Sequence, residues 1–243
     1  MNDTMTKRVF KAAFISSLPV LMGYMAMGMA TGILLAGSIK MKALPFWAFL
    51  SSSINISGAL QFIMVNWTDA MLPFAQVALL TFCLNIRYAM YGFSLIEKFR
   101  PLPFWKRAYL IWSLTDETFA LEAESSLPDK AANTRYCLTV AALDHFYWVF
   151  GVTVGALAGR FLPFSTRGID FAMTALFLVV LTDQCREKRN LIPAVIGILS
   201  AIIGRICFSM DNMLIPAMLL MTAAFLIFRK KLEKIFSETE AAK

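Results

Sequence analysis

A short polar stretch interrupts an apolar part of the sequence, and its side chains could line a path for a small solute. The stretch covers residues 51–62, and the residues on both sides are apolar enough to lie in lipid. On a regular helix Asn55, Gly58 and Phe62 share one face, with Gln61 beside it. Amide side chains are costly in a membrane unless they face another helix, water or a ligand. The pattern therefore favours a solute pathway, with polar contacts between helices as the alternative.

Charged residues farther along the chain could recognise the two ends of a zwitterion. Asn85 and Arg87 lie late in an apolar segment, and Asp116 and Glu117 are neighbours in a more polar one. A guanidinium is always charged, so Arg87 must pair with a carboxylate, bind carbonyl groups or snorkel to the membrane surface. Either carboxylate could pair with Arg87, bind a substrate ammonium or carry a proton. The alternative for both carboxylates is an ordinary polar helix face at the cytoplasmic surface.

Asp144 and His145 form the only neighbouring carboxylate–imidazole pair in the sequence. Because imidazole titrates near neutral pH, the pair is a candidate proton relay, although a buried hydrogen-bonded pair would show the same pattern. No metal site is predicted, because the chain has one histidine and no Glu or Cys at ligand spacing. The chain also lacks a phosphate-binding glycine-rich loop and the motifs of intramembrane hydrolases. We therefore predict a protein that is not an enzyme and has no cofactor.

The composition indicates an integral membrane protein. Of the 243 residues, 58% are hydrophobic and 16% are charged, whereas soluble domains average about 45–50% and about 25%. The net charge of +7 fits loops that face an anionic cytoplasmic leaflet, and the basic residues are too scattered for nucleic-acid binding. The cysteines show no CxxC spacing, so we predict packing residues rather than disulfides or metal ligands. They are Cys83, Cys137, Cys185 and Cys207.

Seven apolar segments approach the length needed to cross a bilayer, which is about 20 residues. They cover residues 12–37, 46–67, 72–96, 136–160, 169–185, 191–208 and 213–228. The segment 104–127 contains too many carboxylates to face lipid, so we expect an amphipathic connecting helix that lies along the bundle or dips into it. The predicted fold is one all-α membrane domain over residues 1–243, with a charged cytoplasmic tail at 229–243.

The order of the segments also predicts an inverted repeat and an orientation. The pattern of residues 12–96 recurs faintly in 136–208, and one further span follows at 213–228. Three spans per copy force the second copy to be inverted, which is typical of secondary transporters with a solute site near the midplane. With seven spans, lysine and arginine concentrate on one side and predict an outside N-terminus and an inside C-terminus. An eight-span arrangement would distribute them more evenly.

Four motifs, taken in their order and spacing, are more specific than any single residue. They are Gly23-Tyr24 with Gly28 and Gly32, Ser57–Phe62, Leu84–Gly92 and Leu114–Leu121. Together, over roughly residues 10–180, they resemble the AzlC-type family, the large subunit of branched-chain amino acid exporters. The resemblance implies a bacterial inner-membrane protein that exports leucine, isoleucine and valine, with methionine as a further candidate. It also implies an obligate small AzlD-type membrane subunit. One departure is Tyr88, which stands where we would expect histidine.

The resemblance and the residues together predict a mechanism. Arg87, assisted by Asn85, would hold the carboxylate of an amino acid, and Asp116 or Glu117 would hold its ammonium group or the coupling proton. The residues predicted to line the path are Asn55, Gly58, Gln61, Phe62 and Met64. We expect secondary transport driven by the proton-motive force. The alternatives are the transmembrane subunit of an ATP-driven amino acid transporter, a small-solute channel and an intramembrane enzyme that uses the aspartate–histidine pair.

Overall fold

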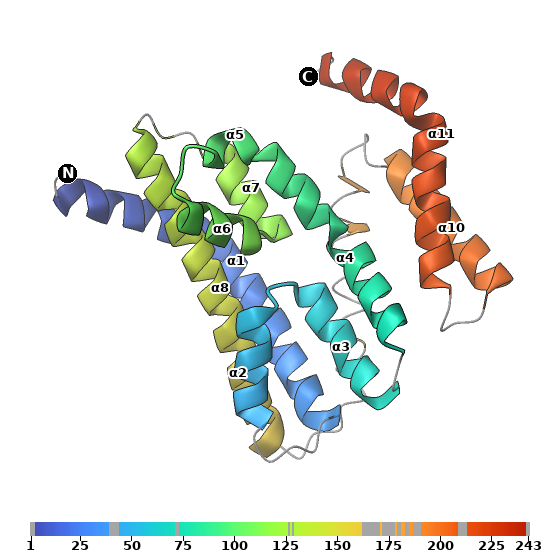
Figure 1. Ribbon diagram of the computed structural model, residues 1–243, viewed down its shortest axis with the longest axis horizontal. Helices are drawn as coiled ribbons and strands as arrows, with labels where there is room; N and C mark the ends of the chain where they lie inside the picture. Colours follow the sequence, from blue (N-terminus) through green and yellow to red (C-terminus); the bar gives the residue numbers. More distant parts are fainter. Residues whose placement is uncertain are drawn as a thin grey trace. The chain divides into compact units, whose positions relative to one another are not determined.

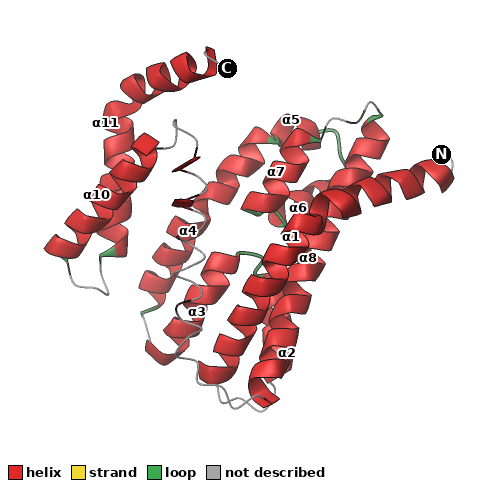
Figure 2. Cartoon of the chain, turned by 180° about the vertical axis from the view of Figure 1, so that it is seen from behind, coloured by secondary structure: helices red, strands yellow, loops and turns green. Residues whose placement is uncertain are grey.

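The protein is described by a computed structural model, in which the chain divides into two compact units, Met1–Asp170 and Phe171–Lys243. The residues that the structure describes are 3–38, 44–70, 73–125, 127, 129–161, 171, 178, 181–182, 185–186, 191–208 and 213–241. These residues are almost entirely helical, and no strand occurs among them (Figure 2). The all-helical prediction is therefore confirmed for the described part of the chain.

The first unit contains eight of the helices labelled in Figure 1. They are α1 (Asp3–Ser38), α2 (Leu44–Ile54), α3 (Gly58–Ala70), α4 (Phe74–Ser94), α5 (Ile96–Phe99), α6 (Phe104–Trp112), α7 (Asp116–Glu124) and α8 (Lys130–Phe161). Within the described residues, two stretches are long and apolar enough to cross a membrane on their own, Met5–Gly37 of α1 and Lys130–Phe161 of α8. The count of seven spans stays a prediction.

Helices α1 and α8 lie side by side (Figure 1) and pack against each other more extensively than any other pair in this unit. Glycines bring their backbones together. A Cβ atom added at Gly32 would lie 2.2 Å from the carbonyl oxygen of Val152, and one at Gly155 would lie 2.3 Å from that of Met29. Real Cβ atoms do not approach so closely, so these positions require glycine. Small residues that let backbones touch are typical of helix contacts in membranes.

The predicted span 46–67 is broken in the middle, so the prediction of one regular helix there is wrong. Helix α2 ends at Ile54 and α3 begins at Gly58. The side chains between them bind the backbone locally: Asn55 Oδ1 accepts from the Ser57 amide at 3.2 Å, and Ser57 Oγ accepts from the Leu60 amide at 3.4 Å. Serine and asparagine compete in this way with helical hydrogen bonds and favour helix starts. The face that a regular helix would give this segment therefore does not form.

The connecting segment 104–127 forms two helices instead of the one expected. Helix α6 ends at Trp112, and α7 starts after Thr115, whose extended backbone and side-chain oxygen cap the helix by accepting from the Thr118 amide at 3.1 Å. The two acidic residues that follow Thr115 suit the positive end of the helix dipole. At nine residues each, α6 and α7 are about 14 Å long. Both are therefore too short to cross a membrane.

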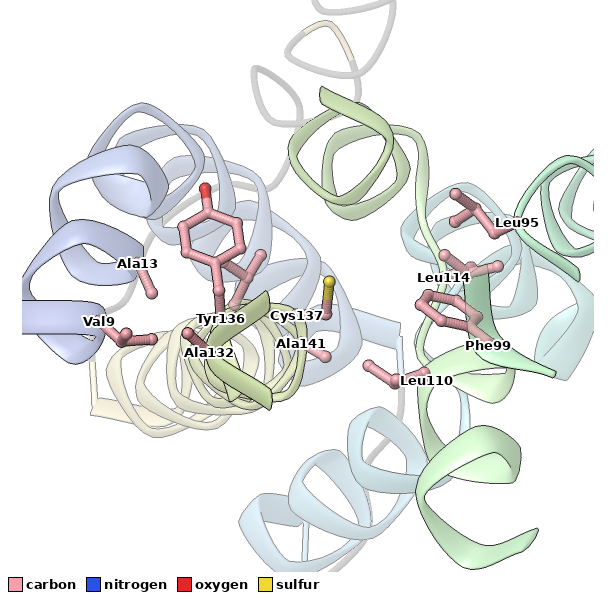
Figure 3. Packing of buried hydrophobic residues seen from close by; sticks show 11 residues of the cluster. Val9, Ala13, Leu95, Phe99, Leu110, Leu114, Ala132, Tyr136, Cys137 and Ala141 are labelled. Atoms are coloured by element: carbon pink, nitrogen blue, oxygen red, sulfur yellow. The ribbon is translucent and has the colours of Figure 1, made fainter. Parts of the chain in front are cut away.

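A buried apolar cluster holds α5 and α6 against α1 and α8 (Figure 3). Its largest fully buried members are Phe99 of α5 and Leu110 of α6. The cluster comprises Val9, Ala13, Leu95, Phe99, Leu110, Leu114, Ala132, Tyr136, Cys137, Val140 and Ala141. Phe119 and Leu121 of α7 pack against the same cluster. The cluster thereby fixes α7, which carries the acidic residues predicted to be functional.

The second unit contains α10 (Leu191–Cys207) and α11 (Leu214–Ala241), which pack against each other. A Cβ atom at Gly204 would lie 3.0 Å from the Cβ of Ala217, so the contact is close. These helices coincide with the predicted segments 191–208 and 213–228, although α11 continues through most of the predicted tail. The predicted segment 169–185 lies largely outside the described residues.

Candidate functional site

An ion pair joins Arg87 of α4 to Asp116 at the start of α7. Arg87 Nη1 lies 2.9 Å from Asp116 Oδ2, and the two side chains remain 43% and 41% exposed. The other carboxylate oxygen of Asp116 accepts from Tyr91 Oη at 2.6 Å. Tyr91 follows Arg87 by four residues on α4, so both residues lie on the same side of that helix. The structure thus brings together two of the predicted site residues and adds a tyrosine that sequence reasoning missed.

Tyr88 connects this ion pair to the break between α2 and α3. Arg87 Nη2 donates to Tyr88 Oη at 3.1 Å, and Tyr88 Oη donates to Ser57 Oγ at 3.3 Å. The guanidinium carbon also lies 5.0 Å from the centre of the Tyr88 ring, within the range of a cation–π interaction. The residue that departs from the expected pattern is therefore a direct partner of Arg87.

Gln61 and Gly58, two residues predicted to line the path, both contact Trp148 of α8. The buried Gln61 amide accepts from Trp148 Nε1 at 2.8 Å and donates to Ser51 Oγ at 3.0 Å. A Cβ atom at Gly58 would lie 3.0 Å from Trp148 Cη2. These contacts join α2, α3 and α8, as in the alternative of polar contacts between helices. Trp148 was not predicted, since its apolar surroundings resemble those of any packing tryptophan.

The remaining predicted lining residues surround the same break. Asn55 is half-buried, and its Nδ2 donates to Met64 Sδ at 3.6 Å. Phe62 is buried. Asn85 lies on α4, which runs unbroken through Arg87, so its side chain points about 200° away from that of Arg87. Its buried Oδ1 has no hydrogen-bond partner within the described residues. The structure gives no contact through which Asn85 would assist Arg87.

Glu117 belongs to a second polar network, which runs from α1 through α7 to α8. Tyr24 Oη donates to both Glu117 Oε2 at 2.9 Å and Thr115 Oγ1 at 2.6 Å. Thr115 Oγ1 donates to Thr118 Oγ1 at 3.0 Å, and Thr118 Oγ1 donates to Asp144 Oδ2 at 2.8 Å. Adjacent carboxylates at 116 and 117 therefore have different partners. The threonines could have been found from the Thr-Asp-Glu-Thr sequence, which has a helix-capping residue at its start.

Asp144 and His145 face different helices. Asp144 is buried and accepts from Thr118 of α7, whereas His145 Nδ1 lies 3.4 Å from Tyr109 Oη of α6. The His145 ring also packs edge-on against Trp112, with ring centres 5.4 Å apart. Among the described residues, no hydrogen bond joins the aspartate to the histidine. The same part of the chain contains no group of three His, Cys, Asp or Glu side chains that could hold a metal ion.

The fold and this site define an all-helical membrane protein with a charged pair and a discontinuous helix among its apolar segments, features that in membranes mark solute pathways. The chain belongs to the AzlC family, because the family model described as "AzlC protein" matches residues 19–162. The match includes every site residue described above. The resemblance inferred from the motifs is thereby confirmed.

Similar proteins cover nearly the whole chain. It is 34% identical to an "uncharacterized membrane protein" of Helicobacter pylori strain J99. The 228 aligned residues cover 93% of this chain and 97% of that protein. It is 30% identical over 239 residues to the branched-chain amino acid transport protein AzlC of Bacillus subtilis strain 168, with coverage of 96% and 92%. Inner membrane protein YgaZ of Escherichia coli K12 is 26% identical over 194 residues, with coverage of 76% and 78%. No solved structure shows a significant match.

Proposed function

We propose that this chain is the large subunit of a two-component secondary exporter of branched-chain amino acids. The substrates would be leucine, isoleucine and valine, with methionine as a further candidate, and the second component a small AzlD-type membrane subunit. The exporter would lie in the bacterial inner membrane, with its N-terminus outside and its C-terminus inside. Membership of the AzlC family and the similarity to the branched-chain amino acid transport protein of Bacillus subtilis support amino acid transport.

The observation that carries the proposal is the half-exposed ion pair between Arg87 and Asp116. An amino acid is a zwitterion, so it offers a carboxylate for the guanidinium and an ammonium group for the aspartate. Since both side chains are reachable from outside the protein, substrate can replace each partner with a group of the same charge. The pair would close on itself when the site is empty, which avoids leaving unpaired charges in a membrane protein.

Aromatic rings beside the pair would receive the apolar side chain of the substrate. The rings of Tyr91 and Phe119 stack with centres 4.4 Å apart, and the Tyr88 ring lies 6.1 Å from that of Tyr91. Tyr91 Oη holds Asp116, so an aliphatic group bound at these rings would be close to the acidic half of the site. This surface replaces the one expected from Phe62, which is buried.

The proposal can be tested by efflux from cells that lack their own exporters and are loaded with a leucine-containing dipeptide. The full chain is expressed alone, with the small membrane protein encoded beside it, and with a protonophore added. Export that needs the small protein and collapses with the protonophore is the expected result. Export that persists with the protonophore but stops on ATP depletion would overturn secondary transport. An absence of branched-chain amino acid export would overturn the substrate assignment.

The same assay tests the ion pair through Arg87→Ala. Arg135→Ala is the matched control, because Arg135 is an exposed arginine of α8 whose guanidinium donates to Thr6 Oγ1 of α1 and takes no part in the ion pair. Export lost in the first variant and kept in the second, at equal amounts of membrane-inserted protein, is the expected result. Normal export from Arg87→Ala would remove its role in holding the carboxylate.

A further inference from the structure

Glu122 of α7 is a carboxyl group in surroundings that do not suit a negative charge. The side chain is fully buried, and within the described chain neither carboxyl oxygen has a hydrogen-bond partner. By contrast, Gln61 and Asp144, two buried polar side chains discussed above, each have at least one partner. Burial of a carboxylate without donors costs far more than burial of a protonated carboxyl group. The geometry therefore favours the protonated form of Glu122.

Four titratable side chains interact with the Glu122 carboxyl group, and the ammonium among them already has other partners. Lys98 of α5 and Asp144 of α8 act on Glu122, and Glu122 acts on Tyr109 of α6 and Cys137 of α8. The Lys98 ammonium donates to three other acceptors, namely the backbone carbonyl of Glu122, the carbonyl oxygen of Ser125 at 2.6 Å and its Oγ at 2.7 Å. Its donors are thus directed at the end of α7 and not at the carboxyl group.

These surroundings shift the protonation equilibrium in one direction. Burial raises the pKa of Glu122 to about 8, with Asp144 acting in the same sense and Lys98 opposing it. A group with this pKa gains and loses its proton within the pH range of a cell. The raised pKa agrees with the contacts of the carboxyl group, because neither of its oxygens accepts a hydrogen bond within the described residues and a carboxylate there would be unfavourable.

The position of Glu122 links it to the ion pair. Asp116 and Glu122 lie at opposite ends of the same short helix, α7. One end of α7 is held by Arg87 through Asp116, and the other by Lys98 through the carbonyl groups of Glu122 and Ser125. Arg87 and Lys98 come from consecutive helices, α4 and α5. A change in the Lys98 contacts would therefore act on the helix that carries Asp116.

We propose that Glu122 is a proton-binding site of this protein, protonated in the conformation described here and paired with Lys98 once its proton has left. The O–H bond of the carboxyl group breaks, the proton passes to water, and the Lys98 ammonium exchanges its carbonyl acceptors for the new carboxylate. That exchange frees the end of α7. The role of this proton in driving export rests on the proposed function, whereas the binding of a proton at Glu122 does not.

Proton occupancy can be measured without any variant and without transport. Dicyclohexylcarbodiimide, an apolar reagent, reacts with protonated carboxyl groups in apolar surroundings. The full chain is labelled in lipid nanodiscs between pH 6.5 and 9.5, and labelled peptides are quantified by mass spectrometry. Labelling of Glu122 should fall roughly thirty-fold over this range, as a pKa of about 8 requires. The exposed Glu124 on the same helix is the internal control. Absent or pH-independent labelling of Glu122, or labelling of Asp144 instead, would overturn the proposal.

The coupling role has a separate test, with Glu122→Gln as a mimic of the protonated form and Glu124→Gln as the matched control. In proteoliposomes that contain the complex, Glu122→Gln should keep exchange of leucine across the membrane but lose accumulation driven by a proton gradient. Accumulation as in the unsubstituted protein would overturn the coupling role. If the unsubstituted protein moves no branched-chain amino acid, the proposed function fails, and the labelling result still decides whether Glu122 binds a proton.

Discussion

The guanidinium of Arg87 lies 2.9 Å from the carboxylate of Asp116, and Tyr91 holds the free oxygen of that carboxylate. The pair joins α4 to α7 at a point where both side chains stay accessible. An ion pair as exposed as this one contributes little to stability, whereas a site that receives a zwitterion has to stay accessible. The first prediction follows from this difference.

Asp116→Asn should lower leucine export by about tenfold or more, because the ammonium group of the substrate loses a charged partner worth about 1.5–3 kcal/mol. The measurement is the initial efflux rate at matched amounts of membrane-inserted protein. Export from Asp116→Asn at the rate of the unsubstituted protein would contradict a role of Asp116 in holding the ammonium group.

Gln61→Ala should lower export and destabilise the protein by about 0.6–2 kcal/mol, because the buried indole N–H of Trp148 and the Ser51 hydroxyl lose their partner. Trp148→Phe removes the indole donor and keeps most of the ring. If the hydrogen bond between Trp148 and Gln61 accounts for the loss of stability, Gln61→Ala should destabilise the Trp148→Phe variant less than it destabilises the unsubstituted protein. Thermal unfolding of the four proteins in detergent measures this coupling, and strict additivity would count against it.

Gly32→Ala should destabilise the protein strongly, by about 1–3 kcal/mol or more, because the new methyl group would lie 2.2 Å from the Val152 carbonyl and force α1 from α8. Gly23→Ala in the same helix is the matched control, since its nearest neighbour would be Met27 Cε at 3.9 Å. Yield of folded protein and thermal midpoint are the readouts. Equal effects of the two substitutions would show that the close contact is not required.

Stability should fall as pH rises from about 5 to about 8, owing to Glu122. The pKa of Glu122 is about 8 in the folded protein, whereas its ordinary value is 4.5. Between these two pH values the folded state therefore binds more protons than the unfolded state. Its contribution is fully present below pH 4.5 and is lost as pH rises through 8. Thermal midpoints across this range should change less in Glu122→Gln than in the unsubstituted protein or in Glu124→Gln. A parallel pH dependence in all three would exclude Glu122 as its cause.

Sequence reasoning reached the apolar helices and the charged residues, but not the geometry that joins them. Much of the long helix at Lys130–Phe161 was expected, because residues 136–160 are mainly apolar. The break at Asn55–Ser57 was missed because the polar residues were assigned to one helix face, whereas they bind the backbone beside them. The pairing of Arg87 with Asp116 was one of several options, since sequence spacing does not show which distant segments meet. Glu122 was not predicted as a site because one of several carboxylates in a polar segment looks solvated, and only tertiary packing buries it.

The close approach of α1 and α8 has a consequence for how such a carrier would work. Where glycine lets backbone touch backbone, as at Gly32 and Gly155, there are no side chains that could adopt a second rotamer, and the interface has a single arrangement. Alternating access needs a part of the molecule that has two. In a transport cycle we would therefore expect α1 and α8 to stay fixed against each other. The helices that meet through exchangeable polar partners, chiefly α4 and α7, would be the parts that move.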